Sequence, residues 1–297
     1  MPELKAIPVI LDTDIGDDID DTWALAMLLK SPEVDLQMVV TDYGNTAYRA
    51  ALTAKFLERA GRTDIPVGVG IVENDQIGRQ GPWVGDYDLD AYPGAVEQDG
   101  VGAMIDLIMQ SDEQVTLLCI GPCPNIAAAL EREPKIAERA RFVGMYGSVY
   151  LGYGGREKTD AEWNVRANPA AVRAAFMASW EKTITPVDTC GIVRLTGDEY
   201  VKVREHGDEI TTALMENYDV WAEGRDFDSA VESSVLFDTV AVYLTYSREL
   251  LEIERIGLSV TDDGFTVPDA HGPEVDVAVR WKDLKRYERY LAERLTG

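Results

Sequence analysis

The chain has 297 residues, 46% of them hydrophobic, and its formal net charge at pH 7 is -25. A surface this acidic repels the phosphates of nucleic acids and of anionic membranes, so we expect a small-molecule ligand and no nucleic-acid or membrane partner. No segment approaches the ~20 apolar residues that span a bilayer, and residues 1–5 lack the features of a signal peptide, which predicts a cytoplasmic protein. Cys119, Cys123 and Cys190 lack metal-ligand spacing, so we expect reduced, mostly buried thiols.

Strand-like and helix-like segments alternate along most of the chain. The predicted strands cover residues 6–11, 36–41, 67–69, 115–120, 141–145 and 183–187, and the predicted helices cover residues 21–29, 46–60, 101–110, 125–131 and 169–179. Beyond Thr196 the pattern is more helical, with helices at 198–205, 210–222 and 239–245, strands at 252–258 and 275–279, and a last helix at 281–295.

This alternation, with nearly continuous apolar strands, predicts an α/β protein with a mostly parallel central sheet, helices on both faces and a more helical C-terminal part. No linker divides the chain, so we expect one domain over residues 1–297. Residues 73–100 are rich in Gly, Asp, Pro and aromatic residues and show weak periodicity, which predicts a long functional loop or lid.

The densest acidic cluster lies between the first strand and the first helix. It contains six carboxylates within ten positions: Asp12, Asp14, Asp17, Asp18, Asp20 and Asp21. Two carboxylates ~5 Å apart repel by roughly 3 kcal/mol at an effective dielectric of ~20, so a converging cluster favours a bound cation. The simpler alternative is a solvated acidic turn. We favour the cation, because a strand-to-helix loop in an open α/β sheet lies at the ligand-binding edge.

Further polar segments follow other predicted strands, at residues 42–45, 121–125, 162–164, 188–189 and 237–238. We expect them to share one edge of the sheet. A set of oxygen donors without a nearby histidine suits Ca²⁺ or Mg²⁺ far better than Zn²⁺, and Ca²⁺ tolerates ligands gathered from distant loops.

Four motifs, in order and spacing, resemble the inosine-uridine preferring nucleoside hydrolase family. The opening D-T-D-I-G-D-D-I-D-D at 12–21 is similar to that family's D-x-D-P-G-x-D-D signature with two extra residues. The later motifs are T-D-Y-G-N at 41–45, L-L-C-I-G-P-C-P-N-I-A at 117–127 and A-E-W-N-V-R-A-N-P-A-A at 161–171. The resemblance covers nearly the whole chain and implies a nucleoside hydrolase-like fold with a Rossmann-like core.

The resemblance also implies the activity: a Ca²⁺-dependent N-ribohydrolase that cleaves a ribonucleoside to free base and ribose. Asp14 would be a calcium ligand and the general base for a metal-bound water. Asp21, Asp238 and the backbone carbonyl of Ile120 would be further ligands, with Asp18 able to take a role assigned to Asp20 or Asp21. A homo-oligomer is expected by this resemblance only.

Ribose recognition is assigned by the same resemblance. Asp20 would accept hydrogen bonds from ribose hydroxyls, and Asn45, Glu162 and Asn164 would complete the sugar pocket. The amide oxygen of Asn45 or Asn164 would also stabilise the positive charge that develops on the sugar, which makes Asn45 a catalytic candidate. Asp12 could support the site from behind.

The chain departs from the family pattern at the leaving-group side. Many members have a histidine directly before the C-terminal metal aspartate, whereas this chain has Phe237, and its two histidines, His206 and His271, lie in poorly matching regions. Arg156 lies near the position of a ribose-contacting Asn and could accommodate a charged substrate. An aromatic ring could hold the base, the candidates being Trp83, Tyr87, Tyr92, Trp221 and Phe227.

Two other functions compete with the hydrolase. L-D-T-D at 11–14 and T-D-D-G at 261–264 are similar to motifs of haloacid dehalogenase-type phosphohydrolases, in which Asp12 would be the nucleophile. The missing histidine and the altered ribose loop instead favour a non-catalytic Ca²⁺-dependent binder of nucleosides or sugars.

Overall fold

The computed structural model describes residues 5–225 and 228–297. Its strands are β1 (Ile7–Thr13), β2 (Val34–Thr41), β3 (Val67–Val69), β4 (Val96–Glu97), β5 (Val115–Cys119), β6 (Ala140–Met145), β7 (Lys182–Thr185), β8 (Leu251–Val260), β9 (Thr266–Pro268) and β10 (Glu274–Trp281). Its helices are α1 (Asp20–Leu29), α2 (Thr46–Arg59), α3 (Gly81–Val84), α4 (Gly100–Gln110), α5 (Pro124–Arg132), α6 (Ile136–Arg139), α7 (Trp163–Ala167), α8 (Pro169–Met177), α9 (Val187–Cys190), α10 (Gly197–Arg204), α11 (Glu209–Ala222), α12 (Phe237–Leu244) and α13 (Leu284–Leu295). Short 3₁₀ turns lie at Leu89–Ala91 and Tyr153–Gly155.

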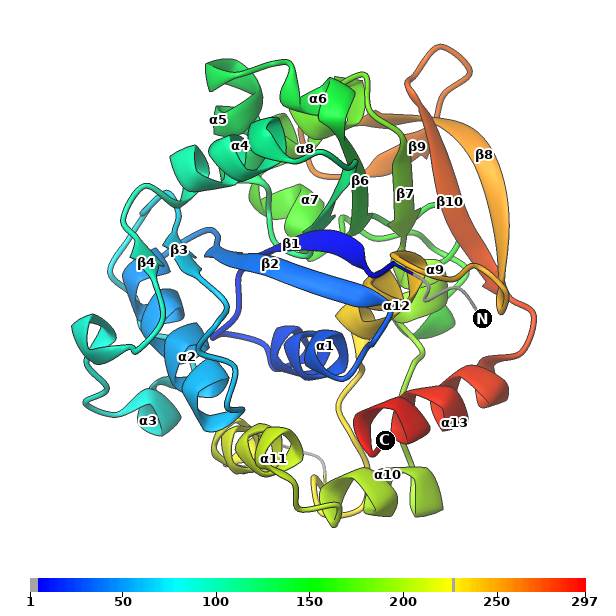
Figure 1. Cartoon of the computed structure of the whole chain (residues 1–297). Coiled ribbons are helices and arrows are strands. Elements are labelled where there is room, and N and C mark those ends of the chain that lie inside the picture. The colour runs from blue at the N-terminus through cyan, green and yellow to red at the C-terminus, as the bar shows by residue number, and fades with distance from the viewer. Residues whose placement is uncertain (1–4, 226–227) are drawn as a thin grey trace.

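The strands of the described residues form one sheet in the order β4-β3-β2-β1-β5-β6-β7-β10-β8-β9 (Figure 1). Neighbouring strands from β4 to β10 pair in parallel, and only the pairs made by β8, with β10 and β9, are antiparallel. The mostly parallel sheet predicted from the sequence is therefore confirmed.

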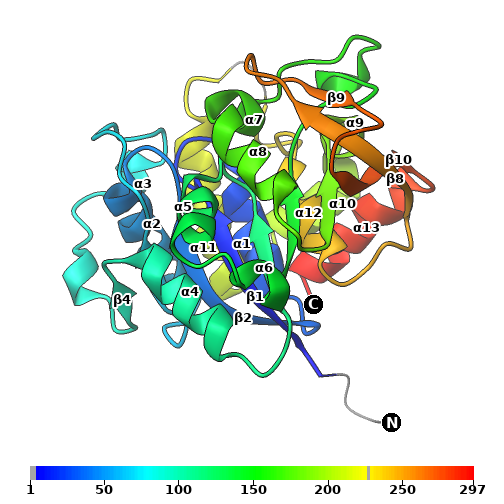
Figure 2. The ribbon, with the colours of Figure 1, turned by 90° about the horizontal axis from the view of Figure 1, so that it is seen from above.

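Helices cover both faces of this sheet (Figures 1 and 2). One hydrophobic cluster joins the sheet to α1, α2, α11, α12 and α13, and a second joins its other face to α4, α5 and α8. In the part of the chain that the structure describes, no helix has the length and apolar character needed to cross a membrane. All three cysteines are unpaired and buried, as expected.

The position of β1 explains where a ligand site can form. The chain leaves β1 toward β2, β3 and β4 on one side and later returns to the other side at β5. Such a reversal opens a crevice at the carboxyl ends of the two central strands, where ligands bind in open α/β sheets. The acidic loop follows β1 directly at this point.

The loop between β1 and α1 is shaped by local geometry. Val9, Ile10 and Leu11 are fully buried in β1, and α1 is buried over nearly its whole length. Between them Gly16 has φ +123°, and a Cβ there would lie 2.8 Å from the ring of Tyr48, whose hydroxyl donates to the Gly16 carbonyl at 2.9 Å. The turn therefore requires glycine and carries its acids over the end of the sheet.

Several segments differ from the sequence prediction, among them the short elements α6, α7 and β9, which it did not contain. Val187 begins α9 instead of ending the strand, and β10 continues to Trp281, so α13 begins only after Asp283, whose side chain caps it. Residues 73–100 contain α3, a 3₁₀ turn and β4. Gln80 fixes this segment to the acidic loop, because its Nε2 donates to the Asp18 carbonyl at 2.5 Å and its Oε1 accepts from Thr22 at 3.0 Å.

Candidate functional site

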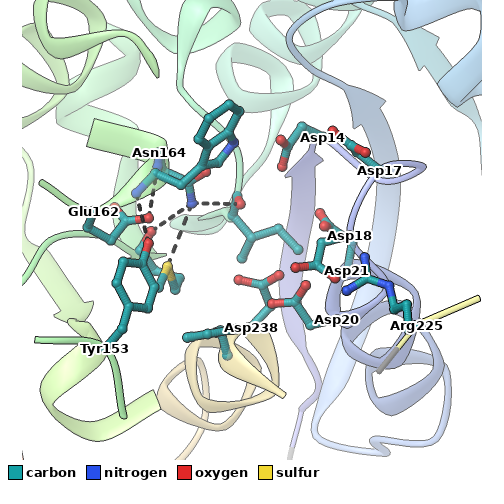
Figure 3. A pocket seen from close by; sticks show the side chains of 14 residues that line it. Asp14, Asp17, Asp18, Asp20, Asp21, Tyr153, Glu162, Asn164, Arg225 and Asp238 are labelled. Carbon is teal, nitrogen blue, oxygen red and sulfur yellow. Dashed lines mark hydrogen bonds between the residues drawn. The ribbon is translucent and has the colours of Figure 1, made fainter. Parts of the chain in front are cut away.

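A cavity of about 340 Å³ opens at the carboxyl ends of the central strands. Figure 3 shows its lining side chains, which come from segments far apart in the sequence. They are Asp14, Asp17, Asp18, Asp20, Asp21, Ile120, Met145, Tyr153, Glu162, Trp163, Asn164, Arg225, Phe237 and Asp238. The fold thus brings the first acidic loop together with the segments at 120, 162–164 and 237–238.

Three carboxylates in this cavity converge closely. Asp20 and Asp21 lie in the first turn of α1 and Asp238 in the first turn of α12, and one oxygen from each lies within 4.8 Å of the others. Helix N-termini favour negative charge, which helps to keep acids at these positions. Asp14 lies outside this trio, although its charge acts on both Asp21 and Asp238.

Burial and mutual repulsion disfavour the ionised forms of these acids. Burial is the largest cause and raises the pKa values of Asp20, Asp21 and Asp238 well above the ordinary range, with neighbouring carboxylates adding to the rise. Burial also raises the pKa of Asp14 to about 6, against the opposing charge of Arg49. A cation would relieve this repulsion and lower all four pKa values.

The donor set fits a hard divalent cation. The cavity lining offers carboxylate, amide and carbonyl oxygens, and no histidine or cysteine among the described residues reaches it. Thr13 orients one of the acids, because its hydroxyl donates to Asp21 Oδ1 at 2.5 Å. The residues that could hold the ion are Asp14, Asp20, Asp21, Asp238 and the Ile120 carbonyl, with Asp18 beside them.

Glu162 and Asn164 form a second wall, at the start of α7. Glu162 accepts backbone N–H groups from Gly147 at 3.0 Å and Asn164 at 2.8 Å, and burial raises its pKa to about 7. The Asn164 amide donates to the carbonyls of Ile120 at 3.0 Å and Met145 at 3.1 Å (Figure 3). Asn164 therefore fixes the carbonyl that was predicted as a metal ligand and keeps its own Oδ1 available for a ligand.

Three predicted substrate residues lie outside the cavity lining. Asn45 caps α2, where its Oδ1 accepts the Tyr48 N–H at 3.1 Å. Trp83 lies in α3 and is buried in the core, with its ring against Phe56 and the ammonium group of Lys55 over it. Arg156 is exposed to solvent and pairs with Asp160 at 2.7 Å.

The other candidates for base or acid roles also lie elsewhere. His206 is close to Asp208, and His271 lies on an exposed turn. The hydroxyls of Tyr87 and Tyr92 bond to the Glu58 carboxylate and the Ile65 carbonyl on the far side of α2. Trp221 is buried beside the cavity, and Phe227 lies outside the described residues.

Asp12 does not reach the cavity. It is fully buried behind Asp14, where it accepts a hydrogen bond from Asn125 at 2.8 Å, and burial raises its pKa to about 7. Asp262, in the other segment similar to phosphohydrolase motifs, is exposed and pairs with Arg173. A nucleophile needs access to substrate, so these positions argue against the phosphohydrolase alternative.

Sequence reasoning missed four lining residues: Met145, Tyr153, Trp163 and Arg225. Met145 is the last residue of a strand that the sequence predicted, and Trp163 lies inside the recognised motif at 161–171. Both could therefore have been found from the sequence. Tyr153 and Arg225 lie in loops whose course only tertiary contacts determine, and no pattern in their neighbourhood indicates them.

Several known proteins are similar to this chain in sequence or in fold. The chain is 30% identical to a pyrimidine-specific ribonucleoside hydrolase of Enterobacter sp. (strain 638), over 73% of this chain and 72% of that protein. It is 26% identical to an inosine-uridine preferring nucleoside hydrolase of Crithidia fasciculata, over 89% of this chain and 88% of that protein.

The structure of a plant nucleoside hydrolase superposes with a TM-score of 0.82 at 23% identity, covering 99% of this chain and 100% of that one, which shows a shared fold. Residues 9–288 match the sequence model of a protein family that is described as inosine-uridine preferring nucleoside hydrolase. The chain therefore belongs to the inosine-uridine preferring nucleoside hydrolase family.

Proposed function

We propose that this protein is a Ca²⁺-dependent N-ribohydrolase that cleaves the N-glycosidic bond of a ribonucleoside to give free base and ribose. The observation that carries the proposal is a single cavity in which a buried acidic trio, Asp20, Asp21 and Asp238, faces the wall made by Glu162 and Asn164. The trio suits a cation, and the opposite wall offers fixed oxygen acceptors for sugar hydroxyls. The names of the relatives, which act on pyrimidine ribonucleosides, inosine or uridine, support a ribonucleoside substrate.

The cation, when bound, would lower the pKa of a coordinated water and orient ribose hydroxyls. The nearby Asp14 carboxylate, which the positive charge of the cation would keep ionised, takes the proton of the attacking water. Glu162, held by three backbone N–H groups, accepts a ribose hydroxyl without moving. Asp20 binds a second hydroxyl, and the Asn164 Oδ1 faces the positive charge that develops on the sugar.

The bond changes balance without a covalent enzyme intermediate. The water oxygen bonds to C1′, the bond from C1′ to the base nitrogen breaks, and its electron pair remains on the base. Asp14 holds the water proton and later returns it to solvent, while the base takes up a proton. Direct attack by water inverts the anomeric centre, so the first sugar product should be α-ribose.

The deciding experiment measures ribose release from a panel of purine and pyrimidine ribonucleosides, with calcium and after chelation, for the wild type and Asp14→Asn. We expect calcium-dependent release that the variant loses. Absence of release from every nucleoside, with calcium still bound, would contradict the proposal.

A non-catalytic binder is the second candidate, because Phe237 stands where many family members have a histidine and no imidazole lines the cavity in the described part of the chain. Isothermal titration separates the two functions. Saturable nucleoside binding without turnover would select the binder.

A further inference from the structure

Arg225 is the only cationic side chain among the described residues that line the cavity. Its guanidinium lies over the ring of Trp221, with its central carbon 3.5 Å from the ring centroid. Trp221 is itself fixed, because its indole N–H donates to the Asp17 carbonyl at 3.0 Å. The aromatic ring thus holds a charged group flat at the edge of the cavity.

The guanidinium has donors available for a ligand. Arg225 forms no ion pair with a carboxylate of the described residues, and its buried Nε has no hydrogen-bond partner among them. Asp18 and Asp17 act on it only through longer-range charge interactions. Nε itself is out of reach of a ligand, so the terminal N–H groups of the guanidinium are the donors that Arg225 offers to the cavity.

Arg225 lies on the side of the cavity away from the sugar wall. Figure 3 shows it beside Asp18 and Asp20, with Glu162, Asn164 and Tyr153 across the acidic cluster. In a ribonucleoside the base on C1′ and the hydroxymethyl group on C4′ extend from opposite ends of the ring. With its hydroxymethyl end at Glu162 and Asn164, a bound ribonucleoside directs its base toward Arg225.

The reaction needs a group that stabilises the departing base at the Arg225 side of the cavity. Cleavage leaves an electron pair on the base nitrogen, and Phe237 cannot donate to it. The Tyr153 hydroxyl belongs to the sugar side, where it accepts the Trp163 N–H at 3.0 Å, and burial and the charge of Glu162 raise its pKa. A guanidinium keeps its proton but stabilises an anion by charge and by paired N–H donors.

We propose, resting on the proposed function, that Arg225 binds the departing base and stabilises the negative charge that forms on it. The C1′–N bond breaks with its electron pair on the base, Arg225 donates hydrogen bonds to this anion, and solvent protonates the base after release. Trp221 positions the guanidinium for this contact. The role is that of a leaving-group residue in a site without an imidazole acid.

The test compares two leaving groups at saturating calcium. Arg225→Gln should lower kcat for a ribonucleoside that the wild type hydrolyses by about 10²-fold. It should lower kcat for p-nitrophenyl β-D-ribofuranoside by less than about threefold, because nitrophenolate departs without assistance. Arg225→Lys should recover part of the loss, since it restores charge without the planar donors.

Arg79→Gln is the matched control, because Arg79 also acts on the charge of Asp18 but does not line the cavity. It should change neither rate by more than about threefold. Equal losses on both substrates in Arg225→Gln, no loss on either, or a nucleoside-selective loss in Tyr153→Phe instead would overturn the inference. Failure of the wild type to hydrolyse either compound would overturn the proposed function and the inference with it.

Discussion

Asp20 and Asp238 lie against each other, with one carboxyl oxygen of each within 4.8 Å of the other, although α1 and α12 are far apart in the chain. Burial and the repulsion between the two groups raise both pKa values, so without a cation the pair favours a protonated form. A divalent cation would displace the proton and let both acids ionise. The site is therefore expected to couple metal binding to proton release.

Asp238→Asn should weaken calcium binding by roughly 100-fold, because it removes one charge from the converging trio. Isothermal titration with Ca²⁺ measures the effect. Asp262→Asn makes the same charge change on an exposed side chain and should leave the affinity as in the wild type. An unchanged affinity in Asp238→Asn would remove Asp238 from the coordination shell.

Thr13→Val should lower calcium affinity by about tenfold, because the Thr13 hydroxyl no longer orients the Asp21 carboxylate while the side-chain shape is kept. Thr53→Val is a suitable control, since Thr53 is equally buried but bonds only within α2. Equal affinities for the two variants would show that Asp21 needs no such support.

Asp14→Asn should reduce kcat by about 10³-fold at saturating calcium, because the amide cannot accept the water proton. Steady-state ribose release measures the rate, and circular dichroism checks that the structure is retained. Turnover close to the wild-type rate would refute the role of Asp14 as base.

Asn164→Ala should raise KM for a ribonucleoside by about tenfold. Asn164→Asp should be worse than Asn164→Ala, because a carboxylate would face the carbonyl oxygens of Ile120 and Met145 that now accept from the amide. Inhibition by free ribose reports the sugar contact directly. Wild-type KM in both variants would exclude Asn164 from ribose recognition.

Glu162 gives the calcium-free protein a defined pH dependence. Its folded-state pKa of about 7 lies above the ordinary 4.5, so its contribution to stability is fully present below pH 4.5 and is lost as pH rises through about 7. At about 1.4 kcal/mol for each tenfold change, the loss amounts to about 3 kcal/mol of unfolding free energy.

Urea unfolding in chelator at pH 4.5 and pH 8 tests this dependence. Between these pH values the unfolding free energy of the wild type should fall by more than that of Glu162→Gln, and the difference should be about 3 kcal/mol. Glu157→Gln, on an exposed loop, should behave as the wild type does. A pH dependence that is identical in all three proteins would contradict the raised pKa.

The strand and helix pattern was readable because each element carries its own signal. The apolar run of β1 and the acid-rich start of α1 need no distant partner to be recognised, and the parallel order follows from their alternation. The boundary errors fall where tertiary packing extends an element, as at Trp281, whose indole N–H donates to the Thr189 carbonyl at 2.8 Å.

Among the site residues, those in the opening loop could be predicted because strand geometry and charge density act locally on Asp14, Asp20 and Asp21. Trp83 shows the opposite case. Its aromatic ring could stack on a nucleobase or pack in the hydrophobic core. Only the tertiary contact between Trp83 and Phe56 shows that it packs in the core.

By itself the sequence determined the α/β alternation and the acidic loop, and its motifs indicated the family, because these depend on residue type and spacing along the chain. Only the tertiary structure decided which of the polar segments share the cavity. It placed Asp238 against Asp20, removed Asp12 and Asn45 from the lining and brought Arg225 to the rim. Such placements arise from contacts between elements far apart in the chain, which no local pattern encodes.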